Sequence, residues 1–381
     1  MGALAENGDD TMGAGAAPAA DDFTSGEGIA WGWRGLSLDV ARHWFGVGDI
    51  EMVLDLMEPL HLNVLHLHLT DDQGWRIEVP GWPQLTERSS SGAVGGDPGG
   101  FLTTTDWEHL AGLARSRGIA LVPEIDVPGH TNAALHALAG LNPDGQAREA
   151  YEGIEVGFST LSTRAPLTRR FLDEVLAHAV TLGNGTVHIG GDESLATTHE
   201  EYLELVGLAV GAVRAAGGRV VAWQEAAGLL GEGDMVQVWD ERQDPAPVVE
   251  AARRGVGVIL SPASRTYLDA KYSEDFPLGL TWAGTSELRD CLEWDPRGAV
   301  AGLDPACITG IEAAVWTETL RTREDLTTML LPRLAAVADV AQRGSGVGRW
   351  EEFRDRVAPM ARRWEDMGVA WHRSPGVDWP D

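Results

Sequence analysis

The stretch Thr186-Val187-His188-Ile189-Gly190-Gly191-Asp192-Glu193 shows the pattern of the whole fold, because a short apolar strand runs directly into a turn that carries acids. After Trp31 a similar pattern recurs along the chain. A strand-like run is followed by polar or aromatic residues, and then by a stretch with apolar residues spaced three and four apart. Eight such strands alternating with helices over roughly 340 residues predict an α/β fold, the (β/α)8 TIM barrel.

The expected helices include residues 49–60, 105–117, 168–182 and 200–216. Strands are expected at 35–38, 63–69, 119–123, 186–189, 219–222, 235–238, 257–260 and 310–315. An open doubly wound sheet is the alternative, but no Gly-rich dinucleotide fingerprint follows the first strand. We expect a flexible tail at residues 1–30 and a single barrel domain at 31–381.

The composition limits the partners of this chain. With 44% hydrophobic residues it can bury a sizeable core, and 58 acidic against 29 basic residues give a net charge of −29. Such a surface repels phosphate backbones and anionic lipids, so nucleic-acid and membrane partners are not expected. Two cysteines cannot form a disulfide framework, and the N-terminus has no apolar signal region, so a cytoplasmic setting is the default expectation.

Acids and aromatic residues follow the predicted strands. A barrel brings the carboxyl ends of its strands together at one face. There, tryptophan rings would stack on sugar rings and carboxylates would accept hydrogen bonds from hydroxyls, which predicts a sugar pocket. In strand order these residues are Asp39 and Arg42; Asp71 and Asp72; Glu124, Asp126 and His130; Asp192 and Glu193; Trp223 and Glu225; Trp239 and Asp240; Tyr267 and Asp269; Trp316 and Glu318.

The adjacent pair Asp192 and Glu193 constrains the chemistry. Most glycosidases use two carboxyls about 5–9.5 Å apart across the scissile bond, usually from different strands. Neighbours at one strand end diverge, so one can reach the leaving oxygen while the other serves another point on the sugar. A substrate that brings its own nucleophile, a 2-acetamido carbonyl, suits this arrangement. The alternative is that the acids merely cap a helix.

Taken together, these motifs resemble the glycoside hydrolase family 20 β-N-acetylhexosaminidases from about Trp33 to Trp350. The resemblance rests on motifs in family order: Arg34-Gly35 with Leu38-Asp39 and Arg42-His43, residues 66–76 (HLHLTDDQGWR), residues 124–130 (EIDVPGH), residues 188–193 (HIGGDE), Trp223-Gln224, Val238-Trp239, Tyr267-Leu268-Asp269 and Trp316-Thr317-Glu318.

The resemblance implies a retaining, exo-acting enzyme that removes terminal GlcNAc or GalNAc through an oxazolinium intermediate. In that mechanism Glu193 is the general acid and base, with a raised pKa, and Asp192 holds the acetamido N–H. Tyr267 bonds the acetamide oxygen, and Asp126 and His130 form a dyad near Glu193.

The resemblance also assigns the sugar contacts and implies no metal or organic cofactor. Trp223, Trp239 and Trp316 would line the acetamide pocket and the sugar face, with Trp282 on the leaving-group side. Arg34, Asp269 and Glu318 would bond the ring hydroxyls, and Asp71 would support the site from the second strand.

Two rival functions are considered. A metal-dependent barrel hydrolase would use His66 and His68 with the acids and histidines Asp71, Asp72, His130, His188 and Asp192. However, His66 and His68 precede the strand end, which places them inside the barrel. A non-catalytic carbohydrate-binding barrel would normally have lost an acid, and here both acids and the tyrosine remain.

Family members often carry a small α/β domain ahead of the barrel, and only 33 residues precede Arg34. An apolar flank would then need a cover, so a homodimer is one expectation. The Ser- and Gly-rich loop at residues 89–100 is expected to lie at the mouth and to be mobile. The natural glycan, and the choice between GlcNAc and GalNAc, stay open.

Overall fold

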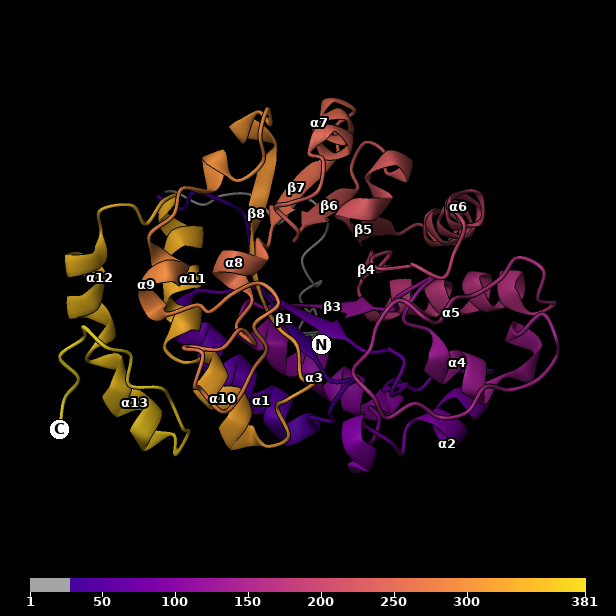
Figure 1. Ribbon diagram of the computed structural model, residues 1–381, viewed down its shortest axis with the longest axis horizontal. Coiled ribbons are helices and arrows are strands. Elements are labelled where there is room, and N and C mark those ends of the chain that lie inside the picture. The colour runs from indigo at the N-terminus through magenta and orange to yellow at the C-terminus, as the bar shows by residue number, and fades with distance from the viewer. Residues whose placement is uncertain (1–27) are drawn as a thin grey trace, which may run out of the picture.

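A computed structural model describes residues 28–381 and folds them into a closed barrel of eight parallel strands (Figure 1). The strands follow chain order around the barrel, and β8 closes it by pairing with β1. Each predicted strand overlaps an observed one, so the predicted TIM barrel is confirmed. The strands are β1 (Trp33–Asp39), β2 (Val64–His68), β3 (Ala120–Glu124), β4 (Thr186–His188), β5 (Arg219–Trp223), β6 (Met235–Val238), β7 (Gly257–Leu260) and β8 (Ile308–Val315).

Helices surround the strands, and the last two, α12 and α13, lie to one side of the barrel beyond α10 and α11 (Figure 1). Three of the outer helices start at threonine caps: Thr103, Thr198 and Thr322 accept hydrogen bonds from backbone amides at the starts of α3, α6 and α10. The helices are α1 (Val47–Met57), α2 (Gln84–Ser89), α3 (Thr104–Ser116), α4 (Asn132–Ala137), α5 (Thr168–Leu182), α6 (His199–Ala215), α7 (Ala246–Arg253), α8 (Ala263–Thr266), α9 (Leu288–Leu292), α10 (Arg323–Leu330), α11 (Arg333–Arg343), α12 (Trp350–Val357) and α13 (Met360–Asp366).

The interior of the barrel is layered, because alternate residues of each strand point inward. The layer nearest the amino ends of the strands is an apolar cluster: Trp33, Val64, Val122, Val221, Met235 and Ile259. Two residues further along several of these strands the interior becomes polar, with the buried residues His66, Glu124, Gln237 and Glu312. The carboxyl ends of the strands therefore rest on a charged layer above an apolar one.

The loop at residues 89–100 is held in place by Arg76. Its buried guanidinium donates to the carbonyls of Ser90, Gly92 and Gly100, and also to those of Val40 and Ala41 beyond β1. This corrects the expectation of mobility drawn from the Ser and Gly content, because a buried cation with several carbonyl partners fixes a loop more firmly than its composition indicates.

The predicted N-terminal tail falls outside the described residues, apart from its last three positions. Of these, Ala30 is tied to α11 by its backbone amide, which donates to the carbonyl of Gln342 at 2.8 Å. Among the described residues, no helix is both long enough and apolar enough to cross a membrane.

Candidate active site

A cavity of about 370 Å³ opens at the carboxyl ends of the strands. Eight of the predicted site residues line it: Asp126, Asp192, Glu193, Trp239, Tyr267, Trp282, Trp316 and Glu318. Arg42, His68, Val156, Arg242 and Leu280 complete the lining. Four further predicted residues, Asp71, His130, Trp223 and Asp269, do not line the cavity but contact residues that do.

The turn after β4 holds the two acids through its backbone. Gly190 and Gly191 have φ of 67° and 101°, values that glycine adopts without strain, and Glu193 itself lies in the left-handed region at 40°. A Cβ on Gly190 would lie 1.7 Å from an oxygen of Asp126, so this position tolerates only glycine. α6 begins at His199 and is capped by Thr198, so the alternative that the two acids cap this helix is wrong.

Burial and the neighbouring Asp192 raise the pKa of Glu193, while His130 and Arg42 oppose the shift. The direction matches the expectation for a general acid, which must hold its proton at the working pH. His130 Nε2 lies 3.7 Å from Glu193 Oε2 and 3.8 Å from Asp192 Oδ2. Neither this nitrogen nor Asp192 Oδ1 has a hydrogen-bond partner among the described residues.

The predicted pairing of His130 with Asp126 needs correction. His130 Nδ1 lies 3.3 Å from Asp71 Oδ1, whereas Asp126 Oδ1 accepts the backbone amide of Gly191 at 3.0 Å. Asp126 therefore holds the turn of the acid pair, and Asp71 is the carboxylate that orients His130. The family resemblance implied the Asp126–His130 dyad, but the hydrogen-bonding carboxylate of His130 is Asp71.

The arginine prediction was also wrong in position. Arg34 lies near the start of β1, where its guanidinium donates to the carbonyls of His61, Trp31 and Gly32, at the opposite end of the barrel from the cavity. The arginine of the cavity is Arg42, beyond the carboxyl end of β1. Its Nη2 lies 2.7 Å from Asp71 Oδ2, and its guanidinium lies 5.1 Å from the centre of the Trp316 ring. The position of Arg42 just after a strand end was the sequence signal that could have identified it as a cavity residue.

Aromatic rings form the walls of the cavity. Trp239 and Tyr267 stack with ring centroids 6.4 Å apart and planes 13° from parallel, and Trp282 meets both edge-on at 5.8 Å. Trp282 is 44% exposed and forms the rim. Trp223 is buried behind Trp316, where its indole N–H donates to Glu124 at 3.0 Å. Trp223 was predicted to line the acetamide pocket and the sugar face together with Trp239 and Trp316, but it does not line the cavity and packs against Trp316 at 6.0 Å.

Two neighbouring acids, Asp269 and Glu318, have raised pKa values. Burial, and then the nearby Glu318, raise the pKa of Asp269 to about 8, and burial likewise raises the pKa of Glu318. Asp269 Oδ1 also accepts the backbone amide of Trp316 at 3.4 Å. With a pKa of about 8, the Asp269 carboxyl holds its proton at neutral pH, so it can both donate to and accept from sugar hydroxyls.

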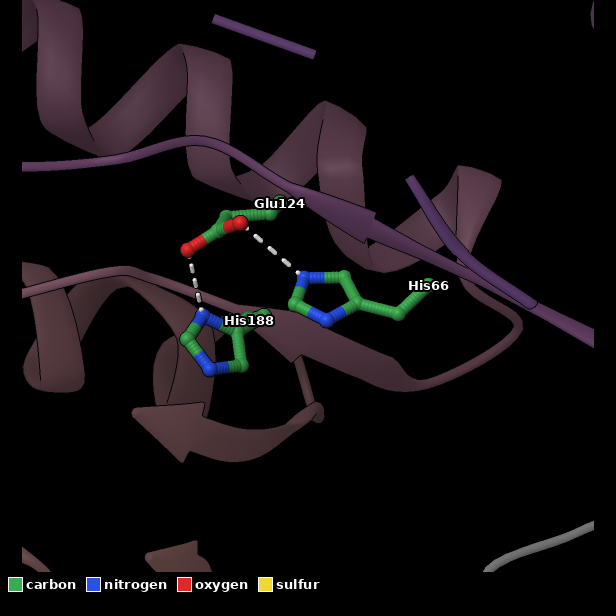
Figure 2. Close-up of side chains that lie close together, drawn as sticks. All are labelled: His66, Glu124 and His188. Carbon is green, nitrogen blue, oxygen red and sulfur yellow. Dashed lines mark ion pairs between the residues drawn. The ribbon is translucent and has the colours of Figure 1, made fainter. Parts of the chain in front are cut away.

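His66 and His68 lie inside the barrel, as predicted, and their ring nitrogens face carboxylates. Glu124 lies between His66 and His188 (Figure 2), with oxygen-to-nitrogen distances of 3.1 and 2.9 Å. His66 Nδ1 also lies 2.9 Å from Glu312, and His68 Nε2 lies 2.8 Å from Asp71. These imidazoles are therefore engaged with internal acids, an arrangement that does not favour the metal-dependent rival.

A TIM barrel whose strand ends present an acid pair in an aromatic-walled cavity has the architecture of a glycoside hydrolase. The model of the glycosyl hydrolase family 20 catalytic domain matches residues 31–344, and the chain belongs to this family. The resemblance seen in the sequence is thereby confirmed, and the chain is a β-N-acetylhexosaminidase.

Similar proteins agree with this placement. A β-N-acetylhexosaminidase of Cellulomonas fimi is 50% identical over 352 residues, which are 92% of this chain and 71% of that protein. The solved structure of the family 20 enzyme of Streptomyces coelicolor A3(2) superposes with a TM-score of 0.89 at 42% identity, covering 92% of this chain and 72% of that one. A mutant β-hexosaminidase of Streptomyces plicatus, solved in complex with the product GlcNAc, has a TM-score of 0.88 at 42% identity, with the same coverage.

Proposed function

We propose that this chain removes single β-linked N-acetylhexosamine residues from chain ends, with retention of configuration, using the substrate acetamide as nucleophile. The observation that carries the proposal is the placement of Asp192 and Glu193 side by side on one turn at one wall of the cavity. Two further acids, Asp126 and Glu318, line the cavity, and Asp126 has one oxygen bonded to the amide of Gly191. The acetamide of the substrate can supply the nucleophile, so the proposed mechanism does not require a protein carboxylate in that role.

The first step uses Glu193 as acid. It gives its proton to the glycosidic oxygen as the bond to C1 breaks, while the acetamide carbonyl oxygen attacks C1 and closes an oxazolinium ring. Asp192 accepts the acetamide N–H and stabilises the positive charge, and the Tyr267 hydroxyl donates to the attacking oxygen. Stacked aromatic rings exclude water from this charge as it develops, which strengthens each contact.

The second step reverses these roles. Glu193, now a carboxylate, takes a proton from a water molecule that attacks C1, and the acetamide carbonyl is released. Two inversions at C1 give a product of the original β configuration. One glutamate serves as acid and then as base, which its raised pKa suits.

The pocket geometry supports exo action on a neutral sugar. A cavity of about 370 Å³ lies at the small end of the range for small-ligand sites, and the exposed Trp282 at its rim offers a stacking face to a leaving group. We propose that GlcNAc and GalNAc are both accepted, because the Asp269 and Glu318 carboxyls can bond a 4-hydroxyl of either orientation.

The test follows the anomer of the released sugar by ¹H NMR, using p-nitrophenyl β-GlcNAc and β-GalNAc as substrates. We expect the β anomer to appear first and a thiazoline that mimics the oxazoline to inhibit competitively. Release of the α anomer first, or indifference to the thiazoline, would contradict substrate-assisted retention. Tight GlcNAc binding without turnover, in wild type and Glu193→Gln alike, would favour the binding-only rival.

A further inference from the structure

Beneath the cavity, imidazoles and carboxylates alternate in an unbroken series that the proposed mechanism does not use. We name it the imidazole–carboxylate chain, and its members in order are Glu312, His66, Glu124, His68, Asp71 and His130. The successive nitrogen–oxygen distances are 2.9, 3.1, 2.5, 2.8 and 3.3 Å. Figure 2 shows its middle, where Glu124 lies against His66. At its outer end, His130 faces Glu193 and Asp192.

Every member of this chain is at most 2% exposed. Water therefore screens their charges only weakly, and each buried charge needs an opposite charge beside it. The interior supplies this balance by placing cationic imidazoles between acids. A change in the charge of one member alters the electrostatic environment of the next, because the two are in direct contact.

We propose that His68 is a positioning residue for the general acid, since its ring joins the charges inside the barrel to the Asp71–His130 pair that faces Glu193. His68 Nδ1 lies 2.5 Å from Glu124 and its Nε2 lies 2.8 Å from Asp71. The inference rests on the proposed role of Glu193. It adds that His68 fixes the charge and the geometry of the Asp71–His130 pair that faces Glu193.

Other groups also face these side chains. Arg42 Nη1 lies 3.1 Å from His68 Nε2, and the Trp316 ring meets the His68 ring edge-on at 5.1 Å. Burial and the nearby Arg42 oppose a charge on His68, but Glu124 and Asp71 together hold its pKa well above the usual value for histidine. Asp71 is held in addition by Arg42 at 2.7 Å and by the backbone amide of Asp72 at 2.6 Å.

His130 is likewise surrounded by charge. Burial opposes its cationic form, whereas Asp71, Asp192 and Asp126 raise its pKa well above the usual value. Arg42 Nη2 lies 3.4 Å from its Nδ1. Replacing His68 with a neutral residue removes one positive charge. The ion pairs of Glu124 with His66 and of Asp71 with Arg42 remain. The surroundings of Glu193 then become more negative, so Glu193 should hold its proton to higher pH.

Two neutral substitutions separate charge from geometry. In His68→Gln the side-chain amide can replace Nε2 and keep the bond to Asp71, while in His68→Asn it can replace Nδ1 and keep the bond to Glu124. We expect both variants to move the alkaline limb of kcat/KM upward, by about half a pH unit or more. We expect kcat to fall about tenfold or more in His68→Asn and only a few-fold in His68→Gln, with KM within about threefold.

His178→Gln, on α5 and outside the imidazole–carboxylate chain, is the control and should leave the pH profile unchanged. A merely structural role for His68 would lower kcat in both variants without moving the limb. Alkaline limbs that coincide with wild type, or equal kcat losses in the two variants, would overturn the inference.

A second measurement does not need turnover or a folded variant. Nitrogen-15 NMR of the histidine rings in the wild-type protein should show His68 and His130 as imidazolium above pH 7.5. Neutral rings at that pH would overturn the inference. If p-nitrophenyl β-GlcNAc is not hydrolysed, the proposed function fails, whereas the ring spectra separately show whether His68 carries the charge on which the inference depends.

Discussion

Glu193 has a left-handed backbone at φ 40°, a conformation that costs a non-glycine residue on the order of 1 kcal/mol. Three contacts hold the turn in this strained form. Asp126 accepts the Gly191 amide at 3.0 Å, the Tyr202 hydroxyl donates to the Gly191 carbonyl at 2.6 Å, and Ser194 donates to the Asp192 carbonyl at 3.1 Å. The direction of the acid is therefore set before substrate arrives.

Gly190→Ala should disable this turn. Its new methyl would meet the Asp126 carboxyl at 1.7 Å and φ of 67° would be strained, so we expect kcat to fall about 100-fold or more. The matched control is Gly185→Ala, where φ is 95° but nothing lies within 4 Å. It should lower stability by roughly 1 kcal/mol and leave kcat unchanged. Steady-state kinetics on both variants checks this, and equal kcat values would refute it.

The pH dependence of kcat/KM should report the raised pKa of Glu193. Since the protonated acid is the active form, activity should fall as pH rises through a pKa above the usual value of glutamate. Glu193→Gln should lower kcat by about 10²–10⁴-fold and abolish that alkaline limb. A wild-type profile that falls already at the pH of an ordinary glutamate would count against this assignment.

Single residues also show where sequence reasoning fails. The motif order placed eight of the predicted side chains in the cavity lining, because strand ends of a barrel converge. It could not tell which carboxylate meets which imidazole, so Asp126 was paired with His130 in place of Asp71. It chose Arg34 over Arg42, although a residue near the start of a strand lies a strand length away from the site.

Among the elements, the strands were predictable because each is a short apolar run bounded by polar residues. The long helices α3, α5 and α6 were predictable from their periodic apolar faces. The short helices α2, α4, α8 and α9 have too few turns to show a period. The loop at residues 89–100 was expected to be mobile from its Ser and Gly content. Its order could not be predicted from the loop itself, because it comes from Arg76, which lies outside the loop in the sequence.

Arg76→Met should therefore destabilise the protein by about 3 kcal/mol, because several carbonyls lose their donor at once. Arg115→Met, on the exposed part of α3, is the matched control and should stay within about 0.5 kcal/mol of wild type. Urea unfolding followed by tryptophan fluorescence measures both. A difference below about 1 kcal/mol between the two variants would mean that the loop carbonyls find other partners.

The molecule as a whole encloses charge within a barrel that water does not enter freely. Burial opposes a charge on His66, but Glu124 and Glu312 raise its pKa to about 9. A folded-state pKa above the unfolded value near 6.5 adds stability that is fully present below pH 6.5. That stability is lost as pH rises through 9, so the interior couples folding to pH.

We expect the free energy of unfolding to fall between pH 6.5 and 9.5, with His66 contributing on the order of 3 kcal/mol. Urea titrations at pH 6.5, 8 and 9.5 measure it, and a folded His66→Gln variant should show a shallower decline. A free energy of unfolding that stays level or rises over this range would contradict a stabilising charge on His66.

The homodimer expected from the sequence stays a prediction. Sedimentation velocity checks it, and a single species at 40.8 kDa would remove it.

The closure of the barrel has a consequence for synthesis. β1 pairs with β8, and the Trp33 indole donates to Glu312 across 279 positions of sequence. A ribosome that has made three quarters of the chain has supplied β2, one partner of β1, but not yet β8, the other, or the second acid for His66. The nascent polypeptide must therefore keep one edge of an apolar strand unpaired and His66 without one of its acids until late in translation, a stage at which chaperones have their largest opportunity to act.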